Sequence, residues 1–283
     1  MFTALISVSD LGPYLGDTDW VVCDCRHDLA DTEAGRRAYA ESHIPGARFV
    51  HLDEDLSAPK TGRNGRHPLP DPQKFVRRLG ELGIDGSKQV VTYDASGGPY
   101  AARLWWMLRW LGHDAVAVLD GGWNAWLNAP HSITTNPLPK IEATRFVPRI
   151  RTEEAVDAKA IAACLGKPGP ILLDARAPNR FRGESETLDP VAGHIPGAIN
   201  RFFQVNLDAD EKFKPAAALR REFGEALGGS APEHVTHYCG SGVTACHNLL
   251  AMEIAGLAGS RLYPGSWSEW CSDPARPVAI GDS

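Results

Sequence analysis

One cysteine of this sequence lies in a setting that suits covalent chemistry. Cys239 follows the run His234–Tyr238, which is typical of a buried strand, and precedes Ala245–Ala255, where apolar residues have helical spacing. The segment between them, Gly240-Ser241-Gly242-Val243-Thr244, lets successive backbone N–H groups point inward at a helix N-terminus, where they favour an anion. Thiols in such settings ionise readily near neutral pH, so we predict that Cys239 is a nucleophile.

Three chemistries use a thiolate held in a loop of this kind. A cysteine phosphatase requires an arginine after five intervening residues, but this chain has Ala245 there, so the fork that binds a phosphate dianion is missing. A papain-like acyl transferase requires an imidazole base; His237 and His247 are near in sequence, but no peptide-cleavage motif surrounds them. In sulfur transfer, the thiolate accepts a sulfane sulfur and becomes a persulfide that the loop amides stabilise.

The other five cysteines are predicted to be small buried side chains without a chemical role. Cys23-Asp24-Cys25 would place its two thiols on opposite faces of a strand, and no second pair has ligand spacing, so we predict no metal site. Cys246 lies inside the helix that follows Cys239 and could resolve an oxidised thiol. A redox sensor or sulfur-binding module without turnover therefore remains a second hypothesis. The remaining two are Cys164 and Cys271.

The sequence contains an internal duplication. One motif, His-Ile-Pro-Gly-Ala, occurs twice letter for letter, and three further segments recur with substitutions. In this pairing Asp94 is the counterpart of Cys239, so the first copy has a carboxylate where the second has its thiol. The matching pairs are Val21–Arg26 with Ile171–Arg176, His43–Ala47 with His194–Ala198, Val90–Asp94 with Val235–Cys239, and Leu119–Trp126 with Tyr263–Trp270.

Each copy has the pattern of an α/β domain. Short apolar runs alternate with helical stretches, which predicts a mostly parallel sheet covered by helices on both faces. We predict a first domain over residues 1–130, an extended linker over 131–150 that includes Asn136-Pro137-Leu138-Pro139-Lys140, and a second domain over 151–283. The predicted strands are Val21–Cys23, Gln89–Tyr93, Ala115–Leu119, Ile171–Leu173, His234–Tyr238 and Ser260–Tyr263, and the clearest helices are Ala101–Leu111 and Ala245–Ala255.

Composition excludes several classes of protein. The 283 residues carry a formal net charge of −6, which argues against a nucleic-acid-binding surface. No apolar run reaches the length of a membrane span, and the first residues lack the basic, apolar pattern of a secretory signal. Six cysteines are too few for a disulfide scaffold of this length. These features predict a cytoplasmic protein that binds neither nucleic acid nor membrane.

The motifs together resemble the two-domain sulfurtransferases of the rhodanese superfamily. The likeness extends from about Val21 to Trp270 and is most specific at Cys239–Thr244, at the two His-Ile-Pro-Gly-Ala segments and at Gly265-Ser266-Trp267-Ser268-Glu269-Trp270. It implies a tandem repeat of five-stranded, mostly parallel sheets in which the first domain is catalytically silent and the second carries the persulfide cysteine. Asp94 agrees with that division, because a carboxylate cannot accept sulfur.

The resemblance also bears on the sulfur donor and acceptor. The neutral loop Gly240-Ser241-Gly242-Val243-Thr244 is similar to that of relatives that use 3-mercaptopyruvate, whereas thiosulfate-using relatives have basic residues there. Arg180 then corresponds to the arginine that binds the donor carboxylate. A second family arginine is missing between Gly183 and His194; Arg182 is the candidate to replace it. The implied acceptor is a thiol, including that of a thioredoxin-like protein, or cyanide, and no cofactor is implied. Thiosulfate remains the alternative donor.

The same relatives have a serine–histidine–aspartate relay that moves protons in the donor. By motif its serine is Ser241 and its histidine is His67, within Arg66-His67-Pro68-Leu69-Pro70. Its aspartate is Asp53, within His51-Leu52-Asp53. The resemblance therefore implies that residues of the silent first copy take part in the reaction.

Overall fold

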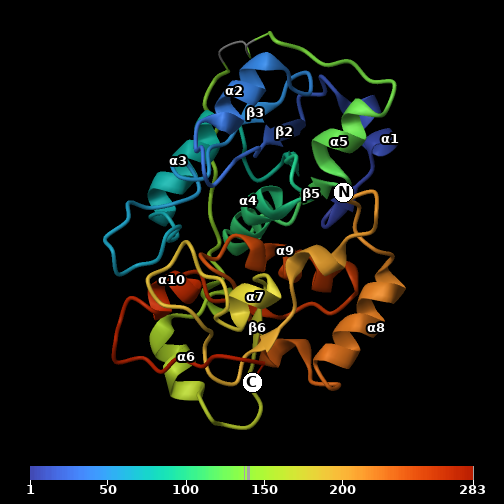
Figure 1. Ribbon diagram of the computed structural model, residues 1–283. Coiled ribbons are helices and arrows are strands. Elements are labelled where there is room, and N and C mark those ends of the chain that lie inside the picture. The colour runs from blue at the N-terminus through green and yellow to red at the C-terminus, as the bar shows by residue number, and fades with distance from the viewer. Residues whose placement is uncertain (137, 139–140, 283) are drawn as a thin grey trace. The chain divides into compact units, whose positions relative to one another are not determined.

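The computed structural model describes residues 1–136, 138 and 141–282, so Pro137, Pro139 and Lys140 of the predicted linker lie outside the described residues. The chain forms two compact units, each containing one repeat apart from a short exchanged segment (Figure 1). Pro59–Leu69 of the first repeat belongs to the second unit, and Ala209–Lys212 of the second repeat belongs to the first. The predicted division at residues 131–150 takes no account of this exchange and stays a prediction.

The first unit is built on a five-stranded parallel sheet. Its central strands pair over most of their length, with Val21 opposite Val90 and Val91 opposite Ala117. The two outer strands are only two residues long, too short to leave a periodic pattern in the sequence. In spatial order the strands are β1 (Leu5–Ile6), β5 (Val116–Leu119), β4 (Gln89–Tyr93), β2 (Trp20–Asp24) and β3 (Arg48–Phe49).

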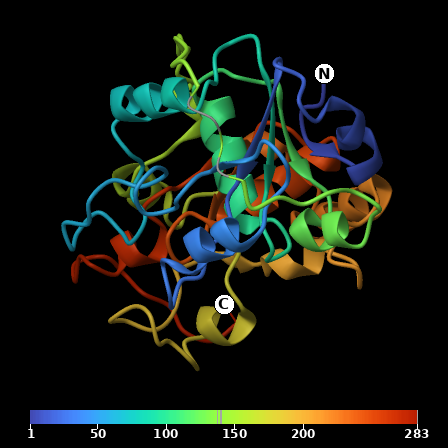
Figure 2. The same cartoon turned by 90° about the horizontal axis from the view of Figure 1, so that it is seen from above.

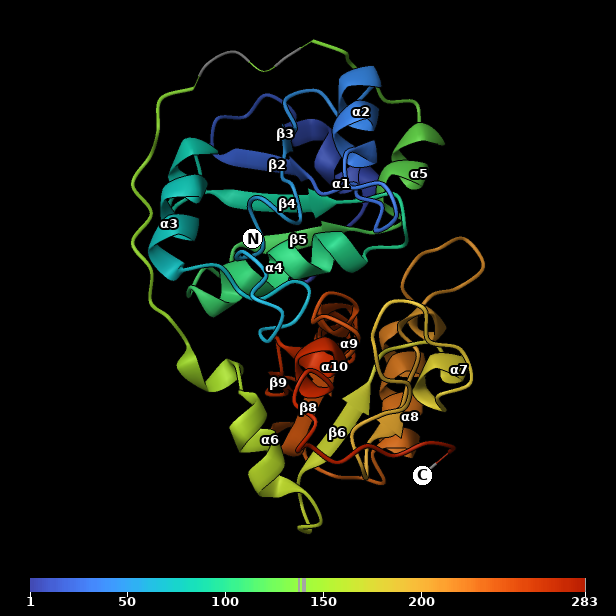
Figure 3. The same ribbon diagram turned by 60° about the vertical axis from the view of Figure 1, so that its left-hand side comes forward.

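Helices cover this sheet because its strands are apolar on both faces. Helix α4 runs alongside β4 and β5 (Figure 3), and Thr92 Oγ1 on this face donates to the carbonyl of Ala101 at 3.1 Å. On the other face Val22, Val91 and Ala117 pack in one buried cluster with Trp123 and Trp126. The helices are α1 (Val8–Leu11), α2 (Ala34–Glu41), α3 (Pro72–Glu81), α4 (Pro99–Trp110) and α5 (Gly122–Leu127). In Figure 2, α2 is blue and α3 is cyan.

The second unit repeats this plan with a four-stranded parallel sheet. The predicted α/β fold of two parallel sheets is confirmed, but the second sheet has four strands rather than five. A 3₁₀ turn, Thr152–Glu154, replaces most of the outer strand, and only Ala155 forms a bridge to Leu262. The strands are β7 (Ile199–Asn200), β6 (Ile171–Asp174), β8 (Val235–Tyr238) and β9 (Arg261–Leu262); the helices are α6 (Ala158–Cys164), α7 (Pro178–Phe181), α8 (Ala216–Ala226), α9 (Thr244–Ile254) and α10 (Ser266–Trp270).

A buried ion pair follows the same strand in each unit. Arg176 forms a fork on Asp174 with an Nη2–Oδ2 distance of 2.7 Å, and its guanidinium lies 4.9 Å from the ring centre of Trp267. Arg26 and Asp24 make the same contact at 2.6 Å in the first unit. Such pairs fix the turn after the strand and cost about as much in desolvation as they return. Because both copies retain the pair and only one has the cysteine, its role is structural.

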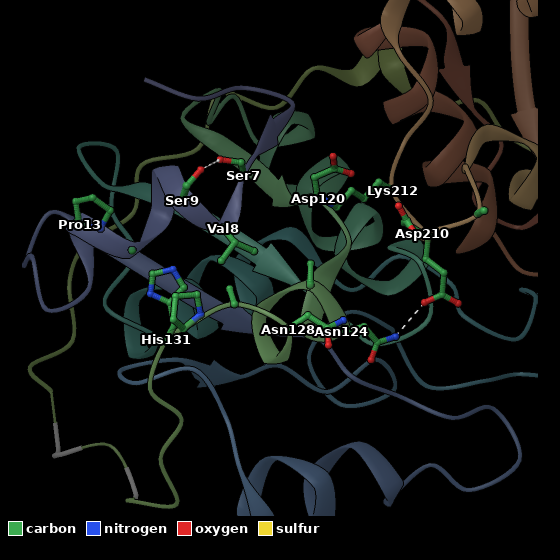
Figure 4. A pocket seen from close by; sticks show the side chains of 16 residues that line it. Ser7, Val8, Ser9, Pro13, Asp120, Asn124, Asn128, His131, Asp210 and Lys212 are labelled. Atoms are coloured by element: carbon green, nitrogen blue, oxygen red, sulfur yellow. Dashed lines mark hydrogen bonds between the residues drawn. The ribbon is translucent and has the colours of Figure 1, made fainter.

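A cavity of about 1120 Å³ lies within the first unit (Figure 4). It is lined by the first helices, by α5 and by the exchanged segment, where Asn124 Nδ2 donates to Glu211 Oε2 at 2.9 Å. No residue of the Cys239 loop lines it. No helix among the described residues is both long and apolar enough to span a membrane.

Candidate active site

The predicted nucleophile lies in the turn between β8 and α9. Cys239 is buried, with 2% of its surface exposed, and its Sγ accepts a hydrogen bond from the N–H of Gly242 at 3.1 Å. Gly242 has a φ of +79°, and a Cβ there would lie 2.3 Å from the carbonyl oxygen of Pro264, so only glycine fits. The left-handed backbone conformation of Gly242 therefore directs its N–H at the Cys239 sulfur, and residues with a Cβ disfavour that conformation.

The N-terminus of α10 holds this turn in place. The hydroxyl of Ser266 accepts from the Cys239 N–H at 3.1 Å and donates to the carbonyl of Tyr263 at 2.9 Å. The N–H groups of Trp267 and Ser268 donate to the carbonyls of Cys239 and Gly240, each at 2.9 Å. The tryptophan motif recognised in the sequence thus fixes the backbone on either side of the thiol.

The equivalent turn of the first unit holds a carboxylate. Asp94 is buried, and its Oδ1 accepts from the N–H groups of Ser96 at 2.8 Å and Gly98 at 2.9 Å. Its Oδ2 accepts from the N–H groups of Tyr100 and Ala101, both at 2.9 Å. Burial raises the pKa of Asp94, and these four donors oppose that shift. The turn of the first unit is therefore an anion cradle, a set of backbone N–H groups that converge on a negative charge, although it holds no thiol.

Two members of the predicted relay lie side by side in the second unit. His67 Nδ1 is 2.7 Å from Ser241 Oγ, and both residues are buried. This contact is possible because Pro59–Leu69 belongs to the second unit although it is part of the first repeat. Asp53 lies in the first unit, in the turn after β3, where its N–H donates to His51 Nδ1 at 3.1 Å. The role of Asp53 stays a prediction.

Arg180 extends from the end of α7 toward the thiol loop. Its guanidinium forms a fork on Glu186 at 2.8–3.1 Å and reaches Asp189 at 3.2 Å. Burial alone would raise the pKa of Glu186, but the Leu188 N–H and the Arg180 fork lower it, so the carboxylate stays ionised. The Nη1 atom of Arg180 lies 3.4 Å from the position that a Cβ of Gly240 would occupy. Arg182 instead pairs with Glu184, which is exposed, and is not among the nearest neighbours of Gly240.

The sequence analysis did not identify Arg66 as a second arginine next to Gly240. Arg66 Nη2 lies 2.6 Å from the Cβ position of Gly240, and its Nη1 pairs with Asp189. The available signal was its position beside His67 in the motif that the family resemblance had identified. Val243 and Thr244 end the loop that the resemblance implies for donor binding; Val243 is buried and directly precedes α9, which begins at Thr244.

The histidines near the thiol in sequence are structural. His237 is fully buried, with its Nε2 3.2 Å from Met252 Sδ, and burial lowers its pKa to about 3. His247 is fully buried, with its Nδ1 3.3 Å from Asn206 Nδ2. Neither arrangement is that of a general base directed at Cys239, so the two imidazoles considered for papain-like acyl transfer do not serve that role.

Four of the other five cysteines are buried as predicted, whereas Cys164, at the end of α6, is partly exposed. Burial raises the pKa of Cys23 to about 12 and that of Cys271 to about 11, and it raises the pKa of Cys25 well above its usual value. Cys246 is fully buried in α9 and its Sγ donates to the carbonyl of Gly242 at 3.3 Å. This contact makes Cys246 part of the support of the loop.

One group of described side chains has the spacing of metal ligands: Glu33, His51 and Glu54. His51 Nδ1 accepts from the N–H groups of Asp53 and Glu54, so its Nε2 carries the proton and donates to the Thr32 carbonyl at 3.0 Å. Neither ring nitrogen has a lone pair to offer a cation. The carboxylates of Glu33 and Glu54 are bridged by Arg36.

The fold and the loop define a class of protein, and comparison with known families names it. The rhodanese-like domain family matches residues 7–129 and 157–273, so this chain belongs to the rhodanese superfamily with two copies of the domain. A probable 3-mercaptopyruvate sulfurtransferase of Pseudomonas aeruginosa is 48% identical over 280 residues, which is 98% of each chain.

Two other relatives share nearly the whole length. A putative thiosulfate sulfurtransferase of Mycobacterium tuberculosis is 39% identical over 98% of this chain and 97% of its own. The solved structure of a 3-mercaptopyruvate sulfurtransferase from Leishmania major is 29% identical and superposes with a TM-score of 0.84 over 95% of this chain and 74% of its own. Relatives of both donor types thus align with this chain.

Proposed function

We propose that this protein is a sulfurtransferase that moves a sulfane sulfur from 3-mercaptopyruvate to a thiol or cyanide through a persulfide on Cys239. The observation that carries the proposal is the anion cradle at the strand–helix turn. In the first unit that cradle binds the Asp94 oxygens with four N–H groups. The outer sulfur of a Cys239 persulfide would be about as far from the backbone as those oxygens, because each is separated from its Cα atom by the same number of bonds. A turn of equal length around Cys239 suits the charged terminal sulfur in the same way.

The proposed reaction has two sulfur-transfer steps. The Cys239 thiolate attacks the sulfur of 3-mercaptopyruvate, a sulfur–sulfur bond forms, and the carbon–sulfur bond breaks. The electron pair of the broken bond stays with the carbon fragment as the enolate of pyruvate. The donor's thiol proton is delivered to that carbon, so that pyruvate leaves and Cys239 keeps the additional sulfur. An acceptor thiolate or cyanide then takes the outer sulfur and the Cys239 thiolate is regenerated.

The Ser241–His67 pair is placed to move the donor proton. The hydroxyl is two residues from the thiol and hydrogen-bonded to the imidazole at 2.7 Å, so together they can accept a proton and return it. Asp53 is the proposed third member that orients His67. We also propose that a thioredoxin-like protein can act as the acceptor and that the protein is cytoplasmic, because its six cysteines are all free.

Replacing Ser241 by alanine is expected to lower kcat with 3-mercaptopyruvate by about 10²–10³-fold, since the relay loses its first member. His67→Asn is expected to have a similar effect, and the double variant no greater one, because the two act as a unit. Steady-state kinetics measure these losses. Ser272→Ala is the matched control, since its hydroxyl donates to the Glu269 carbonyl at 2.8 Å and has no contact with the thiol loop among the described hydrogen bonds. Additive losses in the double variant would contradict the relay.

The choice of donor is tested by comparing kcat/KM for 3-mercaptopyruvate and thiosulfate on the same preparation. We expect 3-mercaptopyruvate to be preferred, because the loop presents Gly240 and Ser241 rather than basic side chains. A preference for thiosulfate would instead support the second candidate, a thiosulfate sulfurtransferase with the same persulfide. The 39% identity to the mycobacterial relative is the observation in favour of that alternative.

A further inference from the structure

A second cavity of the first unit lies at the amino ends of β4 and β5, opposite to the turn that holds Asp94. Gly86 and Ala115 precede the two strands and line the cavity. Phe146 and Val147, which follow α5 along the chain, line it as well. Its volume is about 400 Å³, which is the size of a site for a small organic molecule rather than for a single ion.

Two arginines that have no ion-pair partner line this cavity. Arg145 and Arg149 are both exposed, and neither side chain forms an ion pair or a hydrogen bond with another described residue. Asp114, the acidic residue among the described lining residues, is held instead by Arg151, whose Nη1 and Nη2 donate to its carboxylate at 2.9 and 2.7 Å. The wall of the cavity therefore has two positive charges that no described carboxylate pairs with.

A buried imidazole of the same wall also lacks a partner. His113 lines the cavity with 4% of its surface exposed, and its ring packs edge-on against that of Phe146, with the ring centres 5.8 Å apart. Burial lowers the pKa of His113, so the ring is neutral near pH 7. Its Nε2 has no hydrogen-bond partner among the described residues. A buried polar atom without a partner is unfavourable, and a ligand that pairs with it removes that cost.

We propose that this cavity binds a small phosphate monoester through Arg145, Arg149 and His113. A phosphate monoester carries nearly two negative charges at neutral pH, which match two guanidinium groups, and its oxygens suit their planar forks. Phosphate pairs with either tautomer of His113, because its oxygens accept and its monoanion also donates. The apolar residues Phe146 and Val147 suit the organic part of the ester. This site lies outside the sulfur-transfer reaction and does not depend on it.

Phenyl phosphate is the probe, and isothermal titration calorimetry with the whole chain measures its affinity. We expect Arg145→Gln and Arg149→Gln each to weaken binding about 10-fold or more, because each removes one of the two charges. Benzoate, which has the same ring but a single charge, and inorganic phosphate, which has no organic part, should each bind about 10-fold more weakly than phenyl phosphate. Arg180→Gln separates this cavity from the surroundings of Cys239, and it should bind phenyl phosphate as tightly as the unmodified protein does.

Arg77→Gln is the matched control, because it removes the same charge from an exposed residue of the same unit that does not line the cavity. Nuclear magnetic resonance of protein labelled with ¹⁵N-histidine gives a second measurement. Phenyl phosphate should shift the ring nitrogen signals of His113, which are identified by their loss in His113→Gln. Absence of binding, unchanged binding in Arg149→Gln, loss of binding in Arg180→Gln, or unchanged His113 signals would each overturn the proposal. Inorganic phosphate or benzoate binding as tightly as phenyl phosphate would overturn the assignment to a phosphate monoester.

Discussion

Cys239→Ser is expected to lower turnover by at least about 10⁴-fold with either sulfur donor while the fold stays intact. A hydroxyl has a far higher pKa than a thiol, so it is not ionised near neutral pH, and it cannot form a persulfide. The replacement is nearly isosteric, and the Gly242 N–H that donates to Sγ at 3.1 Å keeps an acceptor. Circular dichroism and thermal unfolding should therefore match those of the unmodified protein.

Mass spectrometry provides the direct measurement for this prediction. Unmodified protein treated with 3-mercaptopyruvate should gain the mass of one sulfur atom on the peptide that contains Cys239, and the serine variant should gain none. Cys246→Ala is the comparison variant, because Cys246 is buried and its Sγ donates to the Gly242 carbonyl at 3.3 Å. Retained turnover in Cys246→Ala would exclude the redox-sensor hypothesis, in which this thiol must resolve Cys239. Turnover within 10-fold of normal in Cys239→Ser would refute the persulfide mechanism.

Acid is expected to destabilise the second unit because of His237. Burial lowers the pKa of this imidazole from 6.5 to about 3, so the folded protein keeps it neutral while the unfolded chain binds a proton below pH 6.5. The unfolded state therefore binds more protons between pH 6.5 and 3, and stability falls as pH falls through that window. The expected loss is about 2 kcal/mol at pH 5 and about 4–5 kcal/mol near pH 3.

Denaturant unfolding at pH 7, 6 and 5 measures this effect. His237→Gln removes the titrating group, so its stability should be lower at pH 7 but should change less with acid. His234→Gln is the control, because His234 is exposed and only three residues away. The transition to follow is that of the second unit, since two compact units need not unfold together. A pH dependence in His237→Gln as steep as in the unmodified protein would contradict the assignment.

The elements that carry the chemistry could be predicted because their signals are local. The helix predicted over 101–111 is found as Pro99–Trp110 and that over 245–255 as Thr244–Ile254. The strand predicted over 89–93 has those bounds. Glycine after the helices and continuous apolar runs in the strands identify such elements. Strands of two residues, such as Arg48–Phe49 and Ile199–Asn200, could not be predicted, because two residues have no periodicity.

The site was predictable in its parts but not in its assembly. Cys239 follows from its loop, and Ser241 and His67 from the family resemblance. The position of Arg66 was not predictable, because the direction of its side chain depends on Asp189 and on a hydrogen bond to Ser268 far along the chain. Residues 59–69 are part of the first repeat in the sequence but belong to the second compact unit, and no local pattern in the sequence indicates this.

Because of the exchanged segments, neither repeat alone contains all the residues of one compact unit. A fragment cut from this chain at Arg151 would contain Cys239 and its loop but would lack Arg66 and His67, which pack in the second unit. The fragment that remains would in turn lack Ala209–Lys212. Each unit is thus completed by a segment of the other repeat. We therefore expect that neither repeat can be expressed alone as a complete domain.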